Sequence, residues 1–223
     1  SYRQQYILGG LTQYTVACAD DIYTLAQAEL PETATSQQTS SARLAAVLAL
    51  IPYTGTTSLT STPTTTLGAY DIAQDTNANE YVNRINQAEQ GRIFCDREGT
   101  LVFQPRIGQT LEPVTVTFND TGTGTKYDNL GVEFDQQAII NSATVTLETG
   151  GTPQTSTDSA SISEYFKQSL SISDSLLSSD AQALTLSDYL LDPIPEPRFT
   201  SMSSTFAALS DAQKDALAIM DIG

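Results

Sequence analysis

Apolar residues near the start of the chain recur at the spacing of two amphipathic helices. A strand predicted for residues 14–19 leads into the first helix, which the pair Asp20–Asp21 caps and Pro31 stops. The second helix has Ser40 or Ser41 as its cap and ends at Pro52. The inward-facing positions are Ile22, Leu25 and Ala26 in the first helix and Leu44, Val47, Leu48 and Ile51 in the second.

A third helix is predicted after a tract rich in Thr, Ser, Gly and Pro. The tract covers residues 53–66 and predicts a loop or an extended arm, because these residues disfavour helix. The helix begins at Asp75 or Thr76, continues to about Gln90 and ends at Gly91. Its inward-facing positions are Ala78, Tyr81, Val82, Ile85 and Ala88.

The clearest local pattern is a β-hairpin that directly follows this helix. Residues 92–95 and 100–103 form two short apolar runs, and Asp96–Gly99 connects them. A connection of this length needs one residue in the left-handed conformation, which glycine adopts without strain. We therefore expect a positive φ at Gly99.

The remaining chain alternates short strands with turn-forming residues. Strands are predicted at 114–118, 130–134 and 140–147, with turns at 119–124 and at Gly150–Gly151. A Ser-rich stretch then leads to a helix near 180–191, with Ala183, Leu186 and Leu190 on one side. Prolines at 193, 195 and 197 predict an extended segment that continues as a strand over 198–208, and Ser210–Gln213 is a capping box that opens a last helix. The elements together predict an α+β fold of small, mostly antiparallel sheets with packed helices.

The composition is that of a globular protein. Its 223 residues are 39% hydrophobic and 16% charged, unlike the core-poor profile of a disordered chain. The formal net charge is −16, and a surface with this excess of acidic groups repels nucleic-acid phosphates and anionic membranes. Acidic balance also serves solubility alone. We therefore expect no sequence-specific nucleic-acid binding.

Cysteine usage and hydropathy bear on whether the chain has a disulfide, a membrane span or a signal peptide. Cys18 and Cys95 are the only cysteines, and buried free thiols are favoured over a disulfide between them. The sequence contains no apolar stretch of the length that spans a membrane. Residues 1–10 also lack the basic start and apolar centre of a signal peptide. No membrane span is expected.

Most catalytic chemistry is missing from the sequence. The chain has no histidine, which removes Ser-His-Asp and Cys-His catalysis and imidazole zinc sites. Two distant cysteines cannot form a thiolate zinc site, and no phosphate-binding glycine loop is present. The triplet Asp120–Gly122 matches that of aspartic proteases, but this chemistry needs two such carboxylates about 3 Å apart. A single copy would act only in a symmetric dimer, so a turn is the favoured interpretation.

The other carboxylates are interpreted structurally. Asp20–Asp21 and the pair Asp71 and Asp75 suit helix caps. Asp128, Glu133 and Asp135 suit solvated strand faces, with a calcium contact as the distant alternative. Spacing does not exclude a glycosidase carboxylate pair, but the chain has no Trp on which a sugar could stack. We predict that the chain is not an enzyme and has no catalytic, cofactor-binding or metal-binding residues.

Segment 86–106, in which a helix rich in Asn and Ala runs into the hairpin, carries a family likeness. The positions concerned are Glu89, Gly91, Arg92, Phe94, Asp96, Gly99, Phe103 and Arg106. They are similar to a segment of minor tail proteins from phages of actinobacteria and other Gram-positive hosts, within the family of tail-tip (baseplate) hub proteins. The likeness continues through residues 127–146 and the Ser-rich stretch, so it covers most of the chain. Two departures are Ser142, where the family has a basic residue, and the missing Trp near Tyr189.

The resemblance implies hub-like domains and a division of the chain into segments. It implies three segments: 1–66 with a strand, two helices and an arm of a hub domain; 67–152 with the helix, hairpin and strands; and 153–223, which returns to the hub domain and continues beyond the chain. On this resemblance the chain is a middle section of a longer polypeptide.

The resemblance also implies a function. It implies a homotrimer that closes the tail tube at the tip of the virion, assembled in the host cytoplasm, with distal-tail, tube and fibre proteins as partners. If the chain borders the DNA channel, we expect its acidic excess partly on the axial surface. A host-facing adhesin is the alternative, and a groove of exposed aromatic residues would favour it. A tail-associated cell-wall hydrolase comes third.

Overall fold

The computed structural model describes residues 2–5, 13–16, 19–59, 65–106, 117–119, 124–134, 139–192, 197–205 and 209–218. These residues form an α+β fold with small, mostly antiparallel sheets, as predicted. Strands β1 (Tyr2–Gln5) and β2 (Gln13–Val16) pair antiparallel at the start of the chain. The predicted strand at 14–19 is therefore present in part, and residues 17–18 lie outside the described ranges.

Helix α1 (Asp21–Gln27) begins as predicted and ends earlier than predicted. The Asp20 side chain accepts a hydrogen bond from the backbone N–H of Tyr23 at 3.4 Å, as expected of an N-cap. The helix ends at Gln27, because residues 29–30 form strand β3 (Glu29–Leu30), which pairs antiparallel with β7 (Thr76–Asn77). Pro31 is therefore not the residue that stops α1.

The caps of the next two helices are each displaced from the predicted residues. Helix α2 (Ser40–Leu50) is capped by Thr39, at the end of strand β4 (Gln38–Thr39), because the Ser40 hydroxyl donates to the buried Glu89 carboxylate at 2.8 Å. Helix α3 (Ala78–Glu89) is capped by Asn77, whose side chain accepts from the N–H groups of the next turn. Asp75 cannot serve as the cap because its backbone is left-handed, with φ +61°.

The inward-facing positions predicted for α2 and α3 are confirmed, and their members are all buried. These residues are Leu44, Val47, Leu48 and Ile51 around α2 and Ala78, Tyr81, Val82, Ile85 and Ala88 on α3. The prediction for α1 is confirmed at Leu25, whereas Ile22 and Ala26 are half-buried.

The predicted hairpin is present as strands β8 (Arg92–Cys95) and β9 (Leu101–Gln104), and Gly99 has φ +81°. The turn is held by the Asp96 carboxylate, which accepts from the N–H of Thr100 at 2.7 Å. Strand β5 (Thr57–Leu59) runs parallel to β9, so part of the predicted arm is an added sheet edge. A short strand β6 (Thr66–Leu67) pairs with β4.

Gly91 has a different role from the one predicted. The left-handed residue that ends α3 is Gln90, with φ +54°. A Cβ atom on Gly91 would lie 2.5 Å from the backbone oxygen of Gln104. Gly91 is therefore required by the close approach of β9 to the end of α3, and not by the backbone angle.

The second half of the chain contains both confirmed and unexpected elements. Strands β10 (Asn129–Phe134) and β11 (Ser142–Leu147) and helix α6 (Asp180–Tyr189) were predicted. The Ser-rich stretch before α6 also forms β12 (Gln154–Thr157), α5 (Ser159–Tyr165) and β13 (Ser169–Ser175), which were not predicted. These strands flank β11, with β12 antiparallel and β13 parallel to it.

The C-terminal elements agree with the sequence within the described ranges. Strand β14 (Pro197–Ser203) pairs antiparallel with β10 and is shorter than the predicted strand over 198–208. The capping box before α7 (Asp211–Ala218) is confirmed. The Ser210 N–H donates to the Gln213 side chain at 2.9 Å, and the Gln213 N–H donates to the Ser210 hydroxyl at 3.3 Å. Most of the predicted strand and turn at 114–124 lies outside the described ranges.

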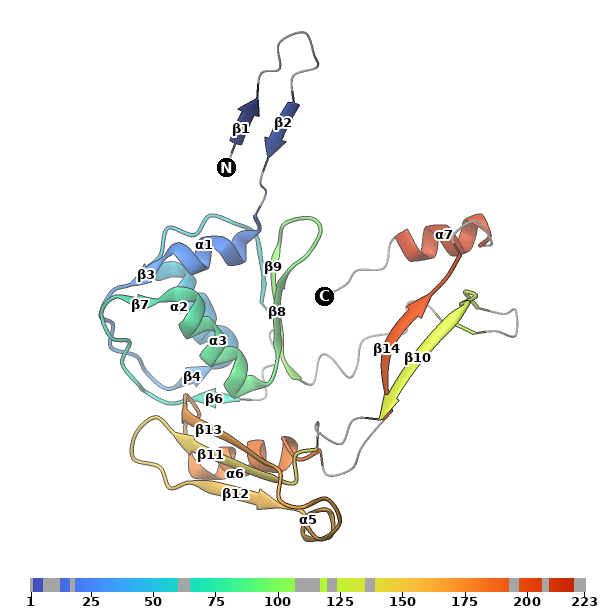
Figure 1. Cartoon of the computed structure of the whole chain (residues 1–223). Helices are drawn as coiled ribbons and strands as arrows, with labels where there is room; N and C mark the ends of the chain where they lie inside the picture. The colour runs from blue at the N-terminus through green and yellow to red at the C-terminus, as the bar shows by residue number, and fades with distance from the viewer. Residues whose placement is uncertain are drawn as a thin grey trace.

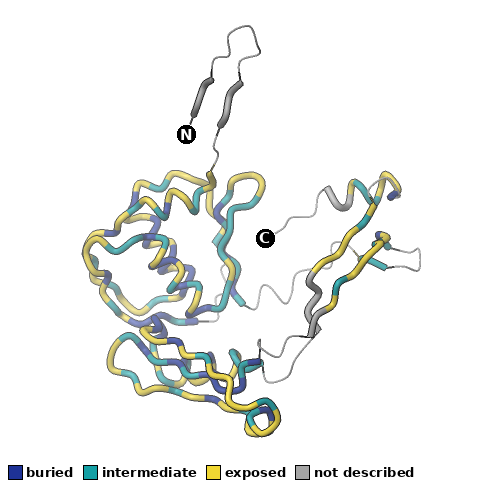
Figure 2. The backbone as a smooth tube through the Cα atoms, viewed as in Figure 1, coloured by how far each residue is buried: buried dark blue, intermediate teal, exposed yellow. Residues whose placement is uncertain are grey.

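One apolar core joins the helical part of the molecule to the sheet of its second half. Figure 1 shows α1, α2 and α3 packed together above the β12–β11–β13 sheet and α6, with the β10–β14 ribbon to one side. Figure 2 shows buried backbone concentrated in α3 and at the junction of the two parts. The cluster includes Leu25, Leu44, Tyr81, Phe103, Val145, Ile172, Leu177 and Leu186.

Backbone hydrogen bonds also tie the two parts together. The Gly68 N–H donates to the oxygen of Leu176 at 2.8 Å, and the Ser178 N–H donates to the oxygen of Thr66 at 3.1 Å. The Tyr70 hydroxyl donates to the oxygen of Leu177 at 2.9 Å. The predicted division into segments 1–66, 67–152 and 153–223 stays a prediction.

Candidate functional site

Several of the carboxylates that the sequence singled out make structural hydrogen bonds. Asp21 accepts from the Tyr53 hydroxyl at 2.7 Å. Asp71 accepts from the backbone N–H of Thr35 at 3.1 Å and caps no helix, which corrects the prediction for it and for Asp75. Burial and the hydrogen bond to Asp21 raise the pKa of Tyr53, so its phenol stays neutral near pH 7.

The remaining predicted acidic residues lie only partly within the described ranges. Asp128 accepts from the backbone N–H of Thr205 at 2.6 Å, which ties the start of β10 to the chain after β14. The side chain of Glu133, all of Asp135 and the triplet Asp120–Gly122 lie outside those ranges. Among the residues that the structure does describe, no group of His, Cys, Asp and Glu could hold a metal ion.

The predictions of free thiols and of no membrane span are tested only within the described ranges. Cys95 is a free, half-buried thiol that packs against the core, whereas Cys18 lies outside the described ranges. No helix within the described ranges is long and apolar enough to cross a membrane.

A buried polar cluster fixes α2 against α3 and the segment before β7. The guanidinium of Arg43 is 1% exposed and donates to the Tyr81 hydroxyl at 2.7 Å and to the backbone oxygens of Ser36 and Gly68, each at 2.8 Å. Its Nε has no hydrogen-bond partner. The cluster compensates a buried charge with neutral oxygens, so it acts in stability and holds no poised acid or base.

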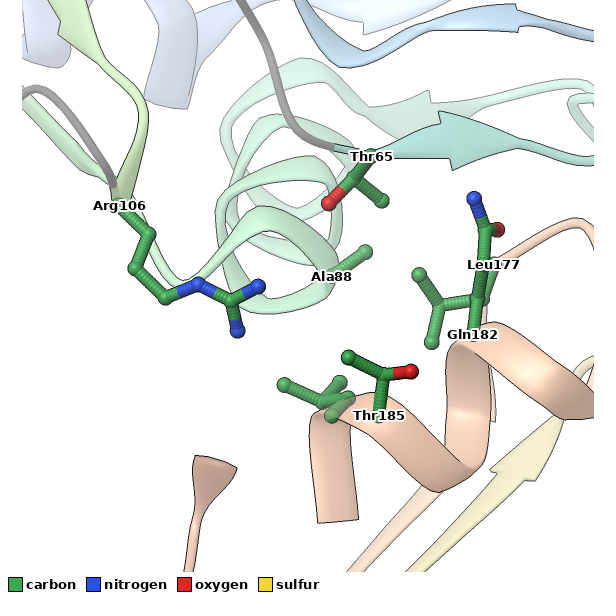
Figure 3. A pocket seen from close by; sticks show the side chains of 7 residues that line it. Thr65, Ala88, Arg106, Leu177, Gln182 and Thr185 are labelled. Atoms are coloured by element: carbon green, nitrogen blue, oxygen red, sulfur yellow. The ribbon is translucent and has the colours of Figure 1, made fainter. Parts of the chain in front are cut away.

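A pocket of about 190 Å³ opens where the two parts of the molecule meet, and we name it the Arg106 pocket. Figure 3 shows the side chains around it, with Arg106 reaching in from the end of β9 and Leu177, Gln182 and Thr185 coming from the other part. Ala88, Leu177 and Leu186 form an apolar, buried floor. The Arg106 guanidinium also lies 4.2 Å from the centroid of the Tyr189 ring, a cation–π contact that holds it at the rim.

Among the described residues, Phe166 at the end of α5 is the most exposed of the large hydrophobic residues. It is 82% exposed. Its backbone, with φ +62° and ψ 169°, occupies a region that is almost restricted to glycine. The fully buried Asn141 holds this conformation, because its amide donates to the Phe166 oxygen at 2.7 Å and its own oxygen accepts from the Gln168 N–H at 2.7 Å.

Comparison with solved structures found a protein of similar fold. The crystal structure of the tail protein from Neisseria meningitidis MC58 is similar over 83% of this chain, with a TM-score of 0.52 and 15% identity. The two chains share a fold. No model of a known protein family matches the sequence, and a search of the curated proteins found no match.

Two further tail proteins were found by the same comparison. The prophage tail protein gp18 from Listeria monocytogenes EGD-e has 14% identity and a TM-score of 0.44 over 79% of this chain. The 43 kDa tail protein of prophage MuSo2 from Shewanella oneidensis has 12% identity and a TM-score of 0.46 over 85% of this chain. This chain spans 54–57% of the length of the three tail proteins.

A second exposed apolar surface is the β10–β14 ribbon. Leu130 and Met202 lie opposite one another in its register, and they are 37% and 44% exposed. Val132, two residues along β10, is 45% exposed. A two-stranded ribbon is marginally stable by itself in water, so exposed apolar side chains on it mark a surface that suits protein contact.

Neither the Arg106 pocket nor Phe166 was predicted from the sequence as a site. Arg106 and Tyr189 entered only through the family resemblance, which did not link them. The pocket draws its residues from separate elements, so it has no local pattern. At Phe166 the only available signal is an aromatic residue inside a Ser-rich stretch, which does not reveal backbone strain.

Proposed function

We propose that this chain is a structural component of a phage tail and forms the central hub at its tip. In this role it closes the tail tube as a homotrimer and organises the distal-tail, tube and fibre proteins. The observation that carries the proposal is the fold shared with the Neisseria meningitidis tail protein over 83% of this chain. The family resemblance of segment 86–106 supports the hub in particular, and with it a Gram-positive host and assembly in the host cytoplasm.

The surface features support assembly better than catalysis. Apolar side chains are exposed on the β10–β14 ribbon and at Phe166, where protein contacts would cover them. The acidic residues Asp20, Asp71 and Asp96 accept hydrogen bonds from backbone N–H groups that hold a helix cap, a long-range contact and a turn, respectively. We therefore propose a non-enzymatic role, with no cofactor. The excess of acidic residues would let DNA slide past the axial wall of the hub, because such a wall does not hold phosphate.

The adhesin alternative lacks a specific supporting observation. Tyr23, Phe166 and Tyr189 are exposed aromatic residues, but they come from α1, from the end of α5 and from α6. Neither the Arg106 pocket nor a second pocket beside α2 is lined by an aromatic side chain of the described residues, whereas a glycan-binding adhesin would use a groove of aromatic residues.

The proposal is tested on intact particles and on the purified chain. Gold-labelled antibody raised against this chain should bind the tip of the tail in electron micrographs. Light scattering after size-exclusion chromatography should give the mass of three chains. Label along the tail tube, or label only on the fibres, would contradict the hub. A monomer at every concentration up to the millimolar range would contradict the homotrimer.

A further inference from the structure

Phe166 combines two unfavourable features that the fold itself does not need. Its side chain is 82% exposed, so it adds almost nothing to the core. Its backbone conformation disfavours every residue other than glycine. An exposed aromatic residue held in such a conformation suits a contact that forms only when a partner is present, since strain of this kind concentrates at functional positions.

The backbone conformation of Phe166 is fixed by hydrogen bonds from a buried side chain. Asn141 is fully buried, and its amide donates to the Phe166 oxygen at 2.7 Å and to the Ser161 hydroxyl at 3.2 Å. Its oxygen accepts from the Gln168 N–H at 2.7 Å. Three hydrogen bonds from one side chain therefore fix α5 and the following turn. Because the backbone at Phe166 is fixed before binding, little backbone entropy is lost when a partner binds.

The Arg106 pocket, which Thr65, Gln182 and Thr185 also line, offers a receptor of matching size on the same molecule. Its volume is about 190 Å³. A cavity of about 150 Å³ lined by apolar side chains takes up benzene, so the pocket has room for one phenyl ring. Its floor is apolar at Ala88, Leu177 and Leu186. The guanidinium at its rim can lie against an aromatic face, as Arg106 already does with Tyr189.

We propose that Phe166 of one copy inserts into the Arg106 pocket of a neighbouring copy. This inference rests on the proposed homotrimer and names one contact that would hold it together. Phe166 and the Arg106 pocket lie on different surfaces of one chain. The contact is therefore head-to-tail, and such contacts produce a ring when the rotation between copies closes.

The contact is tested by cross-linking in a chain whose Cys18 and Cys95 are replaced by Ala. One sample carries Lys167→Cys, which is exposed next to an intact Phe166, and a second carries Thr185→Cys at the pocket. A short bismaleimide reagent should join the two only when they are mixed, giving a product of two-chain mass. Each sample alone should give none. A chain with both substitutions should give linked dimers and trimers.

A second variant separates binding from folding. Phe166→Gly removes the side chain and the backbone strain together, so its melting temperature should equal or exceed that of the wild type. Its trimer should nevertheless dissociate, on dilution, at concentrations about tenfold higher or more than the wild-type trimer, as expected when a buried interface aromatic is removed. Tyr23→Ala, at another exposed aromatic residue on α1, is the matched control and should leave association unchanged.

The outcomes distinguish this contact from the proposed function. A cross-linked pair together with weakened association of Phe166→Gly supports the contact. A stable wild-type trimer with no cross-link and with full association of Phe166→Gly overturns the contact and leaves the proposed hub standing. A wild-type chain that stays monomeric at all concentrations overturns both.

Discussion

Replacing Tyr81 by Phe removes one oxygen atom from a buried polar cluster and leaves the apolar packing of α3 in place. Tyr81 is 2% exposed and Arg43 is 1% exposed, so water cannot replace the lost partner. The Tyr81 hydroxyl accepts from Arg43 Nη1 at 2.7 Å. Arg43 Nε already has no partner, and Tyr81→Phe would leave a second buried nitrogen less well satisfied.

The magnitude follows from the charge on the donor. A hydrogen bond to a charged group contributes about 1.5–3 kcal/mol, more than one between neutral groups. Among the described residues, Arg43 makes no ion pair with a carboxylate that could take over the role of Tyr81. We therefore expect Tyr81→Phe to lower the free energy of unfolding by about 2 kcal/mol. For a chain of this size the melting temperature should fall by about 4–8 °C.

Urea unfolding followed by circular dichroism measures this change, with Tyr23→Phe as the control at an exposed tyrosine. Burial raises the pKa of Tyr81 even though Arg43 lowers it, so the phenol is neutral near pH 7 and the effect should be equal at pH 6 and pH 8. A double-mutant cycle with Arg43→Met isolates the coupling between the two side chains. A loss below about 0.5 kcal/mol, within the range of surface substitutions, would refute the reasoning.

Three further predictions concern the turn, alkaline pH and catalysis. Gly99→Val should lower the free energy of unfolding by about 1 kcal/mol or more because φ is +81°, whereas Gly99→Asn should retain most of the stability; equal values in urea titrations would contradict the left-handed turn. Because the unfolded chain ionises its tyrosines near pH 10 and the folded chain holds the Tyr53 proton to higher pH, the free energy of unfolding should be constant below about pH 10 and fall above it. Tyr53→Phe should reduce that fall, and an unchanged slope would show that other groups cause it. The purified chain should not hydrolyse peptidoglycan, peptide or polysaccharide, and any turnover abolished by Asp120→Asn would restore the dimeric protease hypothesis.

The sequence by itself determined those features that depend on near neighbours. The apolar stripes of α2 and α3 follow from helical spacing alone, since their members are all buried. The left-handed Gly99 follows from the length of its turn, and the capping box at Ser210 follows from residues three positions apart. The fold class was also predictable, because it is the sum of such local elements.

Tertiary contacts decided the features that join distant residues. Ser40 could have capped α2, but its hydroxyl bonds to Glu89, which lies 49 positions away, and Thr39 takes the cap. Strand β12 contains no apolar residue, and the only apolar residues of the Ser-rich β13 are Leu170 and Ile172. The two strands form because both pair with β11, and because the buried Ser156 and Ser187 bond to each other at 2.7 Å between β12 and α6.

The candidate contact depends on the tertiary structure for the same reason. The Arg106 pocket exists only where α3, the end of β9 and α6 meet, and no spacing in the sequence encodes that meeting. The strained backbone of Phe166 is set by Asn141, 25 positions away along the chain. A residue's intrinsic preference, which is all that a sequence pattern reports, is overridden here by a hydrogen bond from a buried side chain.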